Sequence, residues 1–231
     1  MVPRIPVPTS TPQPMKTLFQ RHPSRAGFTI VELLVVITII ALLFALTIGG
    51  FTYAQKSAAR SRTTVAMNAM KSALERYSTE FGEYPEPQNP GDTIDIAGKS
   101  YDVSGAAMLY QALSGDGYDN IAIAETPADA GPASSDGSID EKESKNIMLT
   151  DMPKEIWINR DGRYFMADGF GRPFQYTKAA PQTDGGSQNT VNSTYDLWSY
   201  GDDEENYTAR SIDTLTAGPV KDASAKWIKN W

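Results

Sequence analysis

Glu32 is the residue whose position in the sequence most clearly indicates a chemical role. It lies at the mouth of a run of 23 residues, Leu33–Gln55, that contains no charged side chain. A carboxylate at membrane depth costs about 2.5–3.5 kcal/mol, so it needs a partner or a way to reach water. Glu32 therefore either snorkels to the membrane interface or pairs with a cation.

Composition excludes most other catalytic chemistry. The 231 residues include no Cys and a single His, His22, which lies upstream of the apolar run. Cys nucleophiles, disulfides and Cys/His zinc sites are therefore excluded. Asp168 and Asp196 could in principle form a glycosidase-like pair, but nothing in the sequence distinguishes them from the other acids. We expect a protein that is not an enzyme; the alternative of another class is a membrane-anchored periplasmic enzyme or binding protein.

Charge is distributed unevenly along the chain. Residues 1–27 carry four basic side chains and no acid, whereas residues 82–231 carry 12 basic and 25 acidic side chains, a net charge of −13. A domain of that charge repels phosphate backbones, so no nucleic-acid partner is expected.

The apolar run is long enough to span a bilayer. Roughly 20 residues cross the hydrocarbon core, and the run exceeds the apolar core of an ordinary secretory signal. Basic residues precede it and the acidic bulk follows. The positive-inside rule therefore predicts a single pass through a membrane, in contact with its lipid, with the N-terminus in the cytoplasm and the large domain outside.

The residues around Glu32 resemble a known processing motif. The sequence reads Arg25-Ala26-Gly27-Phe28-Thr29-Ile30-Val31-Glu32. It is similar to the motif of the type IV pilin and type II secretion pseudopilin superfamily, in which a basic leader ends in Gly, Phe follows, and Glu is the fifth mature residue. The resemblance implies that prepilin peptidase cuts after Gly27 and methylates the amino group of Phe28. Residues 1–27 are then a cleaved leader, beginning at Met1 or at Met15.

Cleavage would give Glu32 its partner. The new α-amino group of Phe28 is a cation at the membrane interface, and Glu32 could pair with it on a neighbouring subunit. An ion pair at low dielectric combines strong attraction with a large desolvation cost, so its main use would be to set the axial register of a filament.

One long helix is predicted from about residue 28 to residue 81. Residues 28–55 form its transmembrane and assembly part, and residues 56–81 an amphipathic continuation. Gly82 should end the helix, and the following prolines should prevent its resumption. The continuation is marked by apolar residues at three-to-four spacing: Ala66, Met70, Ala73, Leu74, Tyr77 and Phe81. Gly49 and Gly50 lower the helix propensity in the middle of this helix. They serve either the packing of the helix or its local melting.

Residues 82–231 are predicted to form a periplasmic globular domain with an insertion at about 86–155. A loop over 82–103 precedes a short helix, Ser104–Leu113, which Ser104 should cap and Gly115 should end. The predicted strands are Glu155–Ile158, Tyr164–Met166, Pro173–Thr177 and Tyr195–Ser199. A long helix packed on a small antiparallel sheet is an α+β arrangement, and the resemblance implies the pilin fold.

Two later segments resemble the major pseudopilin of type II secretion. They are Asp168–Tyr176, with Phe at two positions where that family has Trp and Tyr, and Tyr195–Asp203. In that family a C-terminal acidic loop binds calcium. The resemblance implies a Ca²⁺ site here, with Asp203 and Asp213 as ligands, Asp202 as the substitute and the Tyr200 carbonyl as a further ligand. Oxygen ligands suit such a hard cation. The alternative is a solvated acidic turn.

These features predict a structural subunit of a type II secretion pseudopilus or of a type IV pilus-like filament, supporting protein secretion. Its partners would be other copies of itself, minor pseudopilins, prepilin peptidase and the inner-membrane assembly platform. The alternative within the superfamily is a minor type IV pilin acting in adhesion or DNA uptake.

Overall fold

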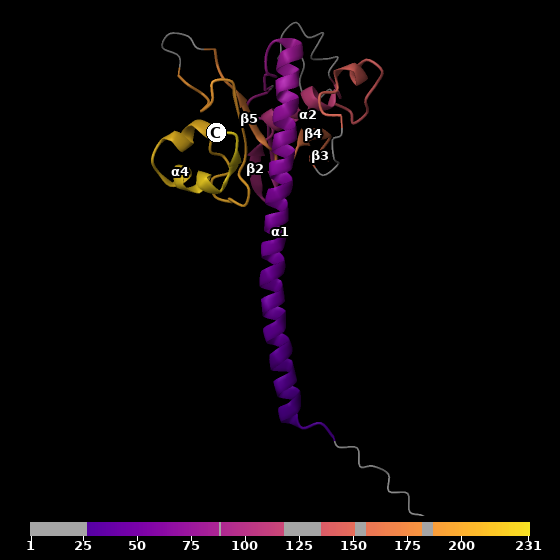
Figure 1. The fold of residues 1–231 in the computed structure, drawn as a ribbon, viewed down its shortest axis with the longest axis vertical. Helices are drawn as coiled ribbons and strands as arrows, with labels where there is room; N and C mark the ends of the chain where they lie inside the picture. Colours follow the sequence, from indigo (N-terminus) through magenta and orange to yellow (C-terminus); the bar gives the residue numbers. More distant parts are fainter. Residues whose placement is uncertain (1–26, 88, 118–134, 151–155, 182–186) are drawn as a thin grey trace, which may run out of the picture. The chain divides into compact units, whose positions relative to one another are not determined.

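The computed structural model describes residues 27–87, 89–117, 135–150, 156–181 and 187–231. The expected leader, apart from Gly27, lies outside these residues. The chain divides into two compact units, Met1–Thr47 and Ile48–Trp231. A single helix, α1, runs through the boundary between them (Figure 1).

Helix α1 comprises the 52 residues Ile30–Phe81, about 78 Å at 1.5 Å per residue. It ends where predicted, because Gly82 adopts a φ of +79° that other residues rarely adopt. The Gly82 amide donates to the Ser78 carbonyl at 2.9 Å. The long helix predicted from the sequence is confirmed, beginning two residues later than expected.

Every described residue of the first unit, 27–47, is exposed. Its large apolar side chains include Phe28 at 82% and Phe44 at 67% exposure. Among the described residues, α1 is the one helix that is long and apolar enough to cross a membrane. This segment therefore has the surface expected of a chain that is covered by lipid or by other subunits.

The second unit is built on one face of α1. From Ala59 onward, buried residues recur every three or four positions: Ala59, Thr63, Ala66, Met67, Met70, Ala73, Leu74 and Tyr77. This stripe forms a core with Phe174 and Tyr176 and with Leu197 of the next strand. The predicted burial of the stripe against the sheet is confirmed.

The strands form three small antiparallel sheets. Strands β3 and β4 make a hairpin, β5 pairs with β6, and β6 pairs with β7. A further hairpin, β1–β2, lies in the segment predicted as a loop, so that prediction was wrong. The strands are β1 Thr93–Ile96, β2 Lys99–Asp102, β3 Trp157–Arg160, β4 Arg163–Met166, β5 Gln175–Lys178, β6 Tyr195–Ser199 and β7 Ile228–Lys229.

Helix α2, Ser104–Ser114, is buried along its whole length. It lies within the segment expected as an insertion, yet it contributes to both apolar clusters of the unit. Gly115 ends it in the left-handed conformation, as predicted. Ser104 is not its cap. The N-cap position is Val103, and the Ser104 amide and hydroxyl both donate to the carboxylate of Asp102, two residues before Ser104.

Short helical turns complete the chain. They are η3 Glu143–Asn146, η4 Ser211–Leu215, α4 Pro219–Ala223 and η5 Ser224–Lys226. The last three lead to Trp227, which is 4% exposed in the second apolar cluster beside Trp198 and Tyr200. The C-terminal segment is thus part of the core. The structure as a whole is the expected α+β arrangement and is consistent with a pilin fold.

Candidate functional site

The first turn of α1 contains the predicted processing and assembly residues. Gly27 and Phe28 are exposed and precede the helix. The amide and the hydroxyl of Thr29 both donate to Glu32 Oε2, at 2.9 and 3.0 Å, and the Glu32 amide donates back to Thr29 Oγ1 at 3.1 Å. This reciprocal arrangement is a capping box, which satisfies two of the free amides at a helix start.

The capping box gives Glu32 a role within its own chain that the sequence analysis missed. The signal was present as Thr29-Ile30-Val31-Glu32, a Thr followed three residues later by Glu before an apolar run. Both of these bonds to the carboxylate use Oε2, so the second oxygen, Oε1, takes part in neither of them. Glu32 can therefore cap its own helix and still present one carboxylate oxygen to another group.

A turn at residues 168–172 joins the sheet region to α1. The Gly169 amide donates to Thr63 Oγ1 at 2.9 Å. A Cβ on Gly169 would lie 2.2 Å from the Ala59 carbonyl oxygen, closer than real Cβ atoms come to backbone. Only glycine allows this approach, which explains its position in the segment that resembles the major pseudopilin.

The buried side chain of Asp168 stabilises this turn. Its carboxylate accepts bonds from the Ser199 hydroxyl and from the amides of Phe170 and Arg172. Burial raises the pKa of Asp168 to about 6, although the bonds from Ser199, Arg172 and Phe170 act in the opposite direction. Asp196, the other acid considered for a glycosidase-like pair, accepts bonds from the Val191 and Asn192 amides. Both carboxylates thus hold turns of their own chain.

The predicted calcium ligands lie in or near an acidic loop, residues 200–206. Asp203 turns inward: its Oδ2 accepts the Trp227 indole N–H at 2.9 Å, and its Oδ1 accepts the amides of Glu205 and Asn206. Although burial opposes the shift, these bonds hold the pKa of Asp203 below its usual range. The Tyr200 carbonyl accepts the Asp203 amide at 3.0 Å.

The other two acids face different cations. Asp202 forms ion pairs with Lys56, at 3.9 Å, and with Arg60, at 3.4 Å. Asp213 pairs with Arg210 at 3.3 Å. Within the part of the chain that the structure describes, no three acidic, His or Cys side chains form a group that could hold a metal ion. The carboxylates proposed as calcium ligands are each engaged by other groups of the chain, which a calcium ion would have to displace.

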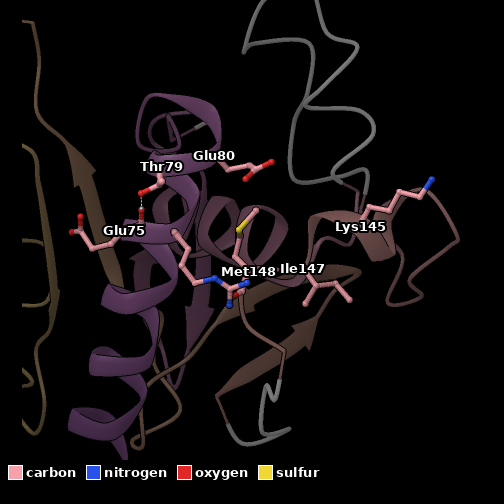
Figure 2. Close-up of a pocket in the computed structure, with 7 residues that line it drawn as sticks. Glu75, Thr79, Glu80, Lys145, Ile147 and Met148 are labelled. Carbon is pink, nitrogen blue, oxygen red and sulfur yellow. Dashed lines mark hydrogen bonds between the residues drawn. The ribbon is translucent and has the colours of Figure 1, made fainter.

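A surface pocket of about 420 Å³ lies beside the last turns of α1. Figure 2 shows Glu75 and Glu80 pointing away from each other and Lys145 pointing outward. Arg76 spans the pocket and donates to the Met148 carbonyl at 2.8 Å. Glu75 Oε2 accepts the Tyr84 hydroxyl at 2.9 Å. Arg76 and Glu75 are thus engaged in contacts within the chain, and the two carboxylates of the pocket do not converge.

Comparison with known proteins supports the N-terminal interpretation. A family described as the prokaryotic N-terminal methylation motif matches residues 22–48. No curated protein and no solved structure matches the chain. The matched residues include Gly27, Phe28 and Glu32, and the match supports placing the chain in the type IV pilin-like and pseudopilin superfamily. Such a motif implies processing by prepilin peptidase and assembly with pilin-like subunits.

Proposed function

We propose that this chain is a filament subunit, cut after Gly27, methylated at Phe28 and assembled through the apolar part of α1. The observation that carries the proposal is the first unit itself: an apolar helix with every described residue exposed, lying within the matched methylation motif of residues 22–48. Burying such a surface against other copies keeps it out of water once the helix has left the lipid.

Glu32 has a specific part in this proposal. Its Oε2 caps α1 while Oε1 is left for the new amino group of a neighbouring subunit. In apolar surroundings such a pair is costly unless it is well aligned, so it favours one axial register over others.

The second unit favours the pseudopilus of type II secretion over a surface pilus. Of the two segments that resemble the major pseudopilin, Tyr195–Asp203 contains β6 and Asp168–Tyr176 ends in the first two residues of β5; the two strands pair with Gln175 opposite Trp198. The two segments therefore meet in one sheet. The domain would lie in the periplasm, with the anchor in the inner membrane.

Electron microscopy of cells overproducing the chain tests the proposal. We expect short periplasmic fibres from the wild type and none from Glu32→Gln, because Gln preserves the capping box but removes the charge. Thr29→Ala is the matched control: it removes the capping box but keeps the carboxylate, so fibres should still form.

The outcomes separate the alternatives. Long surface fibres would identify a type IV pilus subunit, and fibres that form only with other pilins would identify a minor one. Fibres from Glu32→Gln, together with their loss in Thr29→Ala, would reduce Glu32 to a helix cap. A chain that never assembles would favour the membrane-anchored enzyme or binding protein.

A further inference from the structure

Three oxygens of the acidic loop converge on one side chain. Arg172 Nη1 donates to the carbonyls of Gly201, at 2.9 Å, and of Asp203, at 2.8 Å, and Nη2 lies 3.3 Å from Glu204 Oε1. Two carbonyls and a carboxylate are oxygen ligands of the kind that hard metal cations bind. We infer that the Arg172 guanidinium is the cation that closes this loop, and that the loop needs no calcium.

Arg172 is held in place for this task. Its side chain is only 13% exposed. Its amide donates to Asp168 Oδ1 at 2.9 Å, and its carbonyl accepts the Asp168 amide at 2.8 Å. Because Gly169 of the same turn packs against Ala59, the backbone that carries Arg172 is fixed on α1. A guanidinium is always charged and presents several donors in one plane, so it can satisfy separate oxygens at once.

Further basic side chains complete the arrangement. Lys99 donates to the Glu204 carbonyl at 2.9 Å and to its carboxylate at 3.1 Å. Arg60 donates to the Lys226 carbonyl at 2.6 Å and pairs with Asp202. The carboxylates of Asp202, Asp203 and Glu204 thus each face a cation or a donor of the chain itself. A calcium ion would have to displace these contacts to obtain its ligands.

The test is the thermal unfolding of the full chain in detergent micelles, followed by the near-ultraviolet circular dichroism of its tryptophans. We expect the same Tm with a calcium chelator as with millimolar calcium. A native-state calcium site at hundredfold saturation would raise Tm by about 5–10 °C, and such a rise would overturn the inference.

Variants test Arg172 directly. In chelator, Arg172→Gln should lower Tm by roughly 5 °C or more, because buried carbonyls lose a charged donor. The matched control is Arg210→Gln, whose side chain is 74% exposed and also pairs with an acid; it should lower Tm by about 2 °C or less. Equal shifts would contradict the role of Arg172. If Arg172→Gln does not fold, the wild-type calcium titration still decides.

This inference goes beyond the filament role and does not depend on it. A calcium response would leave assembly through α1 standing, and a failure to form fibres would leave the Arg172 contacts as they are.

Discussion

The two units of this chain use similar apolar side chains in opposite ways. In the described part of the first unit, residues 27–47, nothing is buried, whereas Leu74 on the same helix is 0% exposed. The difference is one of partners: the second unit supplies strands and α2 to cover its stretch of α1, and the described residues of the first, 27–47, supply no cover. The exposed apolar surface of that stretch is the kind that lipid or other copies would cover.

The largest expected effect concerns maturation of the first unit. Gly27→Val should abolish fibres, because an uncut leader retains its basic residues and yields no α-amino cation for Glu32. The measurement is the electrophoretic size of the membrane protein together with electron microscopy. Gly50→Val is the control of equal chemistry, since a Cβ at either glycine meets nothing within 4 Å; cleavage should proceed in this variant. Normal fibres from uncut Gly27→Val chains would contradict the account.

The second-largest expected effect comes from truncating a leucine side chain in the second unit, compared with the same change in the first unit. Leu74→Ala should lower the free energy of unfolding by about 2–5 kcal/mol, because it leaves a cavity in a packed core. Leu43→Ala, at a side chain that is 56% exposed, should leave the unfolding of the second unit unchanged. Thermal or denaturant unfolding of both variants in micelles provides the comparison. Similar losses in both would mean that the first unit also contributes to the core.

A smaller effect follows from Asp168. Its pKa is raised from 3.8 to about 6, so between these values the native state binds more protons than the unfolded state. The free energy of unfolding should therefore fall as pH rises from about 4 to about 7, by roughly 1–3 kcal/mol.

Denaturant titrations at several pH values measure this slope. Asp168→Asn removes the titration and should flatten it over that window. Asp202→Asn, at an acid that pairs with Lys56 and Arg60 on the same face of α1, is the control and should retain it. The same slope in the wild type and in Asp168→Asn over this window would exclude the assigned cause.

The smallest effect concerns the middle of α1. Gly50→Ala should strengthen the helix by up to about 1 kcal/mol, because alanine has the higher helix propensity and the added Cβ has free space. Hydrogen exchange at neighbouring amides should become slower. If exchange slows and fibres disappear, local melting of α1 is needed for assembly; if fibres persist, Gly49-Gly50 serves packing.

The sequence allowed prediction where the signal was local. Gly82 and the prolines after it predicted the end of α1, and Asp161-Gly162 predicted the β3–β4 hairpin, whose turn residues both have positive φ. The β1–β2 hairpin escaped because Ala97 takes a φ of +52° there, which alanine rarely adopts, so no Asn-Gly or Asp-Gly signal marks the turn. Its strands are also only four residues long.

The functional residues show the same difference between features with a local sequence signal and features without one. Gly27, Phe28 and Glu32 form a contiguous motif that could be found without a structure, and the Thr29 cap was readable in the same window. The Arg172 contacts could not be predicted, because the oxygens it reaches lie 29 to 32 residues further along the chain. The resemblance implied a calcium site in the acidic loop, but folding points the carboxylates of Asp202, Asp203 and Asp213 at different partners.

The intact mass of the chain purified from its membrane tests the central claim most directly. We predict the mass of residues 28–231 carrying one added methyl group on the Phe28 amine, with fragmentation placing that group on the first residue. A chain that still carries Gly27 and residues before it, in cells that contain an active prepilin peptidase, would contradict the account.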